Sequence, residues 1–199
     1  MAHAELDAFL MRVMQHLPAM SRDKFSTVSW RFEGRPTSEG LGLKPGVDLD
    51  VDKVAACILN VEAYAANLRF VQSCEITNRI ADSDFVYTQK MKLPVIGGVQ
   101  VSLHMEDLGE RDGYRVVAWD QDDASTQALN PKQGGARTQY SLGAWLIKPD
   151  ELAYSLSSAP LKKDVGSIKY AIMTKGADAT AGAALSTTID AMIAWSQRV

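Results

Sequence analysis

Histidine is the side chain that most readily exchanges a proton near neutral pH, and this chain has three, His3, His16 and His104. Two of them lie in the N-terminal stretch, so a Ser-His-Asp triad would have to use His104. His104 alternates with apolar residues, and this alternation places its side chain on the polar face of a strand. The sequence also lacks a Gly-x-Ser-x-Gly elbow. We therefore do not expect nucleophilic hydrolysis.

Residues that bind metals or phosphates are equally sparse. Only two cysteines are present, Cys57 and Cys74, and their spacing does not match a zinc site. The Gly-Gly pairs at 97–98 and 134–135 lack the surrounding pattern of a phosphate-binding loop and indicate turns. No metal and no cofactor are expected. Both cysteines are expected to be reduced, and a Cys57–Cys74 disulfide is left open.

The composition is typical of one soluble globular domain, spanning residues 1–199. Of these residues 46% are hydrophobic and 23% are charged, and no stretch reaches the roughly 18 apolar residues of a membrane-spanning helix. A net charge of -3 gives no long-range attraction to nucleic acid. The first residues do not have the pattern of a signal peptide, so we expect a cytoplasmic protein unless a signal was removed.

Periodicity predicts helices in the first third of the chain. Apolar residues recur at three- and four-residue steps within residues 4–20, the core of an N-terminal helical segment at 1–21. Residues 27–32 and 47–51 alternate and predict two short strands, and Asp52 suits the N-cap of a following helix. The N-terminal helix either packs on its own domain or presents its apolar stripe to a partner protein. Deletion of residues 1–21 would distinguish the two.

A series of strands follows, and most have one apolar face. They are predicted at residues 71–80, 85–93, 99–106, 114–120, 138–148 and 152–158. In the strand at 114–120, either Val116 with Ala118 or Val117 with Trp119 forms the apolar face, and both assignments stay open. Residues 121–136 lack periodicity and are expected to form the longest loop of the sheet region.

The proline-free segment at residues 165–198 predicts a long C-terminal helix. One of its faces is small in the middle, with residues at helical spacing: Ile172, Gly176, Ala179, Ala183, Ser186 and Asp190. We expect this face to cross the apolar side of the sheet, which gives an α+β helix-grip fold, a curved antiparallel sheet wrapped around a long helix. Small residues there either leave a cavity or let the helix lie tightly on the strands, and both remain open.

The arrangement resembles the StAR-related lipid-transfer (START) domains and the wider polyketide-cyclase-like helix-grip superfamily. The resemblance covers residues 47–199 and rests on four segments: 51–64, similar to the family's helix and the turn before its first long strand; 87–94, ending in Leu-Pro; 143–149, with a tryptophan before a proline turn; and 158–160, before the last helix. In one departure, the residues after Leu-Pro are Val-Ile-Gly-Gly instead of the Arg-Asp pair of many relatives.

The resemblance implies a central hydrophobic tunnel, entered through loops between strands and the start of the last helix. The entrance would be formed by Val95, Ile96, Gly97, Gly98, Asn130, Pro131 and Pro160. The pocket would be lined by Phe85, Tyr87, Gln89, Met91, Val99, Val101, Leu103, Met105, Tyr140, Leu142 and Leu146 from the sheet, and by the small helix face. Polar anchors are expected at Tyr87, Gln89, Tyr140 and Asp190.

We therefore expect a non-catalytic protein that binds and transfers a lipid, sterol or fatty acid in an internal cavity. Val95 and Ile96 beside two glycines would suit transient contact with a membrane, and a well-packed hairpin turn explains them as well. The alternative function is a cyclase- or aromatase-like pocket enzyme, in which Asp190, Tyr140 or His104 would be the first acid–base candidates.

Overall fold

The computed structural model describes residues 2–93 and 97–199, with the backbone alone at residues 2, 3, 173 and 175–180. The first part of the chain forms α1 (Ala2–His16), the 3-10 turn Leu17–Ala19, β1 (Ser26–Trp30), β2 (Glu39–Pro45), α2 (Val51–Leu59), the 3-10 turn Val61–Ala63 and α3 (Tyr64–Asn67). The remainder forms β3 (Val71–Ala81), β4 (Asp84–Leu93), β5 (Gly97–Arg111), β6 (Tyr114–Gln121), α4 (Asp123–Ala128), α5 (Pro131–Gly134), β7 (Ala136–Lys148), β8 (Glu151–Pro160), α6 (Lys162–Val165) and α7 (Ser167–Ser196). No helix in the described part is long and apolar enough to cross a membrane.

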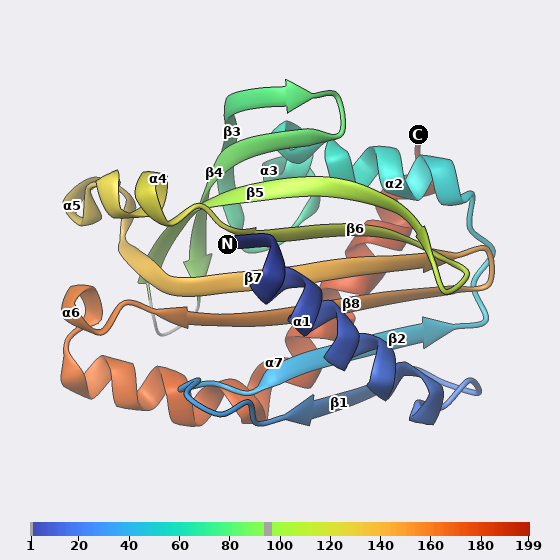
Figure 1. The fold of residues 1–199 in the computed structure, drawn as a ribbon, viewed down its shortest axis with the longest axis horizontal. Helices are drawn as coiled ribbons and strands as arrows, with labels where there is room; N and C mark the ends of the chain where they lie inside the picture. The colour runs from blue at the N-terminus through green and yellow to red at the C-terminus, as the bar shows by residue number, and fades with distance from the viewer. Residues whose placement is uncertain (1, 94–96) are drawn as a thin grey trace.

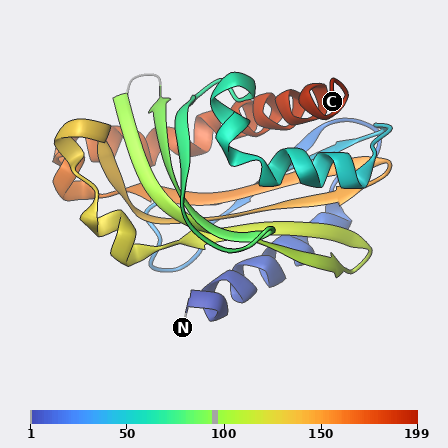
Figure 2. The same cartoon turned by 90° about the horizontal axis from the view of Figure 1, so that it is seen from above.

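The eight described strands form one sheet in the order β1-β2-β8-β7-β6-β5-β4-β3 (Figure 1). Neighbouring strands pair antiparallel, and one short parallel contact joins β5 to β7 at Val99 and Gln100. The sheet curves, with α2, α3 and α7 on one side and α1 on the other (Figure 2). We call these sides the α7 face and the α1 face. This is the predicted α+β helix-grip arrangement.

The apolar stripe of α1 packs against the sheet. Phe9 and Val13 are fully buried in the core of the α1 face. On the same helix, Arg12 donates to both carboxylate oxygens of Glu39, at 2.8 and 2.7 Å, and Trp30 Nε1 donates to one of them at 2.7 Å. The Glu39 side chain is 0% exposed. Both apolar burial and a buried ion pair therefore hold α1 in place.

The described side chains of α7 meet the sheet through the second half of the helix. Leu185 and Ile189 are buried, whereas Ile168 and Ile172 in the first half are 80% and 56% exposed. Gly42 of β2 is the point of close approach, because a Cβ there would lie 3.1 Å from Leu185 Cβ and 3.2 Å from Ile189 Cδ1. A small residue of the strand therefore lets the helix approach the sheet. Gly182 of α7 does the same beside β1, where a Cβ would lie 3.3 Å from Thr27 Oγ1.

The helix face that was predicted to cross the sheet does not do so at its described positions. Ala183 and Asp190 are exposed, and Asp190 pairs with Lys44 at 3.3 Å and accepts a hydrogen bond from Ser186. The side chains of Gly176 and Ala179 lie outside the described residues. The physical reason is the apolar surface area that is buried. The adjacent face, which carries Leu185 and Ile189, removes more apolar surface from water than a face of alanine and serine would.

The segment that was expected to be a long loop contains α4 and α5. The side chain of Asp122 caps α4 by accepting a hydrogen bond from Ser125 N at 2.7 Å. Thr126 Oγ1 accepts from Ser102 N at 3.0 Å and donates to Ser102 O at 3.1 Å, which fixes α4 to β5. These helices have six and four residues, so they are too short to show helical periodicity in the sequence.

Candidate functional site

Four aromatic side chains converge on the α7 face from different strands. Tyr87 comes from β4, Trp119 from β6, Trp145 from β7 and Tyr154 from β8, and all four belong to one core cluster. The ring centroids of Trp145 and Tyr154 lie 4.3 Å apart, and those of Trp119 and Tyr154 lie 5.8 Å apart. We call these four residues the aromatic floor. Trp119, Trp145 and Tyr154 pack side by side, and Tyr87 belongs to the same core cluster.

Trp119 fits into this floor because a glycine lies opposite it. Gly143 pairs with Trp119 across β6 and β7, and a Cβ on Gly143 would lie 2.0 Å from Trp119 Cζ2. Any side chain at this position would displace the indole. The structure also gives the orientation of β6 that the sequence left open: Val117 joins Trp119 in the core of the α7 face, and Val116 joins the core of the α1 face.

Phenol oxygens are the main polar atoms of this apolar interior. Tyr64 of α3 donates its hydroxyl to Ile58 O at 2.5 Å. Among the described residues, the hydroxyls of Tyr87 and Tyr154 have no hydrogen-bond partner, and Ser157 Oγ is the only fully enclosed side-chain oxygen or nitrogen without one.

The electrostatics keep these interior groups neutral. Burial raises the pKa of Tyr154 and of Tyr87 well above their ordinary values, and nearby Tyr64, Cys74 and Tyr154 raise the pKa of Tyr87 further. Burial also raises the pKa of the Cys74 thiol to about 12. No lysine or arginine among the described residues opposes these shifts. At neutral pH the interior therefore offers uncharged hydrogen-bonding groups.

Part of the α7 face is left uncovered by α7. Tyr154, Leu156 and Ser158 are only half-buried, although β8 lies inside the sheet between β2 and β7. Gln89 and Met91 on β4 are half-buried as well. We call the region above these five residues the hollow. A pocket of about 600 Å³, lined by Ser167, Ile168, Ala171 and Ile172, opens beside the first turns of α7.

The predicted lining residues on β4 and β5 lie on the α7 face, and those on β7 do not. On the α7 face are Phe85, Tyr87, Val101, Leu103 and Met105, with Met91 packed against them and with Gln89 and Val99 paired on the same side. Leu142 and Leu146 instead belong to the core of the α1 face, so their assignment to the pocket was wrong. Because helices cover β7 on both faces, its sequence is apolar on both, and alternation carries no information about the face.

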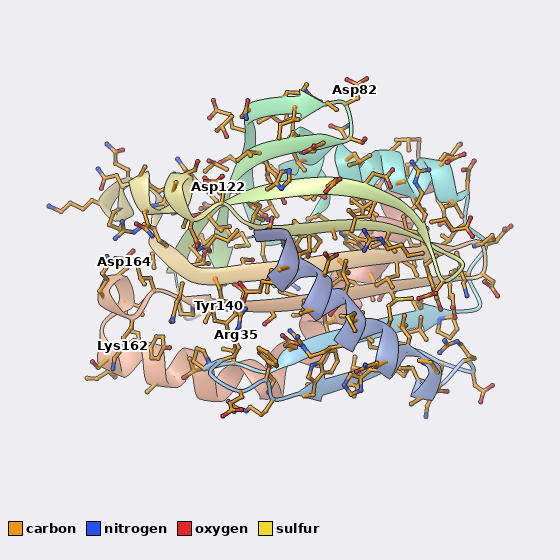
Figure 3. All side chains as sticks on the ribbon, in the orientation of Figure 1. Arg35, Asp82, Asp122, Tyr140, Lys162 and Asp164 are labelled. Carbon is orange, nitrogen blue, oxygen red and sulfur yellow. The ribbon has the colours of Figure 1, made fainter. Side chains whose placement is uncertain are left out.

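The three acid–base candidates also lie away from the floor. Tyr140 is on the α1 side, where its hydroxyl bonds to Thr37 Oγ1 at 2.6 Å and Arg35 stacks 3.7 Å from the ring centroid (Figure 3). Asp190 is the exposed partner of a lysine, as described above. His104 points to the polar side of β5, with Nε2 2.6 Å from Asp84 and Nδ1 3.5 Å from Asp120. Tyr140 and Asp190 therefore do not act as anchors of the pocket.

The predicted entrance segments gather at one end of the sheet (Figures 1 and 2). Gly97 begins β5 with a positive φ of 90°, and a Cβ on Gly98 would lie 3.3 Å from Gly134 O and from Gly135 Cα. Only glycines allow these two backbones to approach so closely. The start of β5 therefore lies against the end of α5.

The other entrance residues have structural roles at the same end. Asn130 caps α5 by accepting a hydrogen bond from Lys132 N at 3.0 Å, and Pro131 occupies the first turn of that helix. Pro160 ends β8 just before α6. Val95 and Ile96 lie outside the described residues. Whether these residues form an entrance stays a prediction.

An ion pair between Arg137 and Asp164 connects the elements at this end of the fold. Asp164 in α6 accepts hydrogen bonds from Arg137 N at 3.0 Å, Nε at 2.7 Å and Nη2 at 2.8 Å (Figure 3). Arg137 Nη1 also donates to Gln127 O in α4 at 2.9 Å. The hydrogen bonds from Arg137 hold the pKa of the Asp164 carboxyl below its ordinary value. The pair therefore ties α6 and α4 to the start of β7.

The Asp164→Asn variant should reveal this ion pair through pH. A carboxyl whose pKa is lowered by folding stabilises the protein above its unfolded pKa of about 3.9, and this contribution is lost as the pH falls through the folded value. We expect the variant to have a lower Tm than the wild type at neutral pH, and we expect this difference to shrink as the pH falls below about 3.9. The exposed Asp23→Asn variant is the control. A Tm difference that does not shrink with falling pH would contradict the assignment.

No protein-family model matches the sequence, and no curated protein matches it. Solved structures do match the fold. A STAR-related lipid transfer protein from Xanthomonas axonopodis aligns at TM-score 0.70 with 16% identity, over 89% of this chain and 96% of that one. Human StAR-related lipid transfer protein 5 aligns at 0.68 with 12% identity, over 99% and 97%. The Zhui aromatase/cyclase from Streptomyces sp. R1128 aligns at 0.54 with 12% identity, over 87% and 94%. The chain shares the fold of these proteins.

Proposed function

We propose, from the START helix-grip fold of this chain, that it binds a hydrophobic small molecule such as a lipid or sterol in the hollow on the α7 face. The observation that carries the proposal is the half-buried state of Tyr154, Leu156 and Met91, which lie on interior strands yet keep accessible surface. Leaving such apolar surface in contact with water costs about 25 cal/mol per Å². A ligand that covers it recovers this free energy, which favours an apolar guest.

Transfer of the guest is the second part of the proposal. The end of the sheet where β5, α5 and α6 meet also carries the first half of α7, whose Ile168 and Ile172 are exposed beside an open pocket. Exposed apolar residues at this end of the sheet suit a molecule that enters and leaves without covalent change. Two of the solved structures with this fold are named as lipid transfer proteins.

A cyclase- or aromatase-like enzyme is the second candidate, favoured by the likeness to the Zhui aromatase/cyclase. Such an enzyme would need an acid or base beside the substrate. The polar groups on the floor are phenols and a thiol that hold their protons at neutral pH, and His104 lies on the polar side of β5. A group that does not release its proton is a poor general base, so this observation favours binding without catalysis.

Native mass spectrometry of protein purified from lipid-containing cells, followed by organic extraction, tests the proposal directly. We expect a bound hydrophobic molecule that organic solvent removes. Failure to bind any sterol, phospholipid or fatty acid would refute it, and turnover of a polyketide-like substrate would favour the enzyme.

A Leu156→Trp variant should locate the site. The added ring would occupy the hollow, and we expect binding to weaken about tenfold or more. The Met11→Trp variant adds the same ring to an exposed position of α1 and should bind like the wild type. Unchanged binding by the Leu156→Trp protein would place the ligand elsewhere.

A further inference from the structure

Two helices at the predicted entrance are joined through one residue of β7, Arg137. Its side chain pairs with Asp164 of α6 through Nε at 2.7 Å and Nη2 at 2.8 Å, and its Nη1 donates to Gln127 O of α4 at 2.9 Å. The backbone takes part as well, because Leu161 N donates to Arg137 O at 2.7 Å. The helices α4 and α6, each close in sequence to a predicted entrance residue, are therefore tied to each other through β7.

This ion pair is shielded from water, which preserves its strength. The side chains of Asp164 and Arg137 are 5% and 14% exposed, and each oxygen of the carboxylate accepts from a different nitrogen of the guanidinium. Water and salt weaken ion pairs on the surface, whereas a shielded bidentate pair keeps most of its attraction. The lowered pKa of Asp164 agrees with this, since the arginine favours the charged carboxylate.

The segment that Asp164 anchors is short and exposed. The helix α6 is a single turn of four residues, and none of them is buried. A turn of this length is not stable by itself. Gly166 follows with a φ of 78°, and a Cβ there would meet nothing within 4 Å. Beyond it, Ile168 and Ile172 of α7 are 80% and 56% exposed, so the first turns of α7 do not bury these side chains on the sheet.

We propose that Arg137 and Asp164 form a latch on the entrance. When the pair is formed, it holds α6 against β7 and α4. When the pair opens, α6 and the first turns of α7 move away, and a guest passes to or from the hollow. The inference rests on the proposed function and concerns the regulation of its site. Because the pair holds the rim and does not contact the guest, it controls how fast the guest exchanges and not how tightly it binds.

The Asp164→Asn variant tests the latch, with the neutral dye Nile red as the guest and stopped-flow fluorescence at neutral pH. We expect the association and dissociation rate constants each to rise about tenfold, while Kd stays within about twofold of the wild-type value. A tenfold rise corresponds to a change of about 1.4 kcal/mol in the opening of the latch. The Arg137→Lys variant keeps the charge and loses the bidentate geometry, so it should raise both rates by a smaller factor.

Hydrogen–deuterium exchange measures the opening of the latch without any guest. In the Asp164→Asn variant, we expect faster amide exchange across residues 161–172, because local opening exposes these amides. Residues 51–59 of α2 should exchange as in the wild type. Faster dye exchange without faster amide exchange at 161–172 would mean that the pair does not act through α6, and it would overturn the proposal.

The Asp107→Asn variant is the matched control. Asp107 accepts from Arg115 Nε at 3.1 Å and Nη2 at 2.7 Å, and this second ion pair lies at the other end of β5 (Figure 1). The control should lose stability and keep the wild-type rates of dye exchange and of amide exchange at 161–172.

Three results would overturn the latch and leave the proposed function standing: dye exchange at the wild-type rate in both latch variants, an equal acceleration in the Asp107→Asn control, or a tenfold change in Kd. The last result would mean that the ion pair acts on the guest itself. Failure of the wild type to bind the dye would instead reject the proposed function, and the latch with it.

Discussion

Replacing Ile189 with alanine is expected to lower the free energy of unfolding by about 2–5 kcal/mol. Ile189 is fully buried, and its Cδ1 approaches the backbone of Gly42 where α7 crosses β2. Truncation would leave a cavity between the helix and the strand, because a glycine offers no side chain that could move into the space. Urea unfolding followed by far-UV circular dichroism measures the change.

Ile172→Ala is the matched control, since it makes the same substitution in the same helix at a residue that is 56% exposed. It should change the free energy of unfolding by less than about 0.5 kcal/mol. The reverse order, a costly Ile172→Ala and a harmless Ile189→Ala, would mean that the opposite side of α7 faces the sheet.

Most strands could be predicted from alternation, whereas the core-facing side could be assigned only for strands that have one polar side. Alternation placed residues 99–106 correctly, because β5 has a polar side and an apolar side there. On β7 both sides are apolar, since α1 contacts one face and α2 contacts the other, and Leu142 was assigned to the wrong one. For β6, the missing information was Gly143 on the neighbouring strand, which makes room for Trp119. The sequence of neither strand alone shows which side of β6 lies on the α7 face.

The error in α7 has a related cause. A helical wheel shows which residues share a face, but it does not show which face meets the sheet. The prediction considered small residues on the helix alone. In the structure, Gly40 and Gly42 lie inside β2, and their lack of a side chain allows Leu185 of α7 to approach the strand closely. The close packing of α7 on β2 therefore depends on glycines that lie more than a hundred residues earlier in the sequence.

The candidate site was only partly visible in the sequence. Tyr87 was identified because a tyrosine among alternating apolar residues suggests a polar anchor in an apolar wall. Tyr154 was missed, although Leu152, Tyr154 and Leu156 alternate along β8 and share the α7 face. This alternation could have identified Tyr154 as a residue of the α7 face. What the sequence could not supply was that residues of β4 and β8 belong to one core cluster.

An Arg12→Ala variant is expected to lose about 3–5 kcal/mol of stability. The substitution removes two charge-assisted hydrogen bonds to the Glu39 carboxylate, which is 0% exposed. Trp30 Nε1, at 2.7 Å, is then its remaining hydrogen-bond donor among the described residues. A buried carboxylate without its cation is costly whatever surrounds it. Arg111→Ala is the control, because its contact with Asp7 of α1 is long, at 3.5 Å, and exposed on both sides. That change should cost no more than about 1 kcal/mol.

A double variant, Arg12→Met with Glu39→Leu, separates the two components of this effect. If the loss in Arg12→Ala comes from the uncompensated charge, replacing both partners with apolar residues should restore most of the stability. A double variant as unstable as the single one would show instead that the pair is needed to position α1. Because α1 and the hollow lie on opposite faces of the sheet, the folded double variant should bind its ligand like the wild type (Figure 2). Stability and binding are then separable properties of this fold.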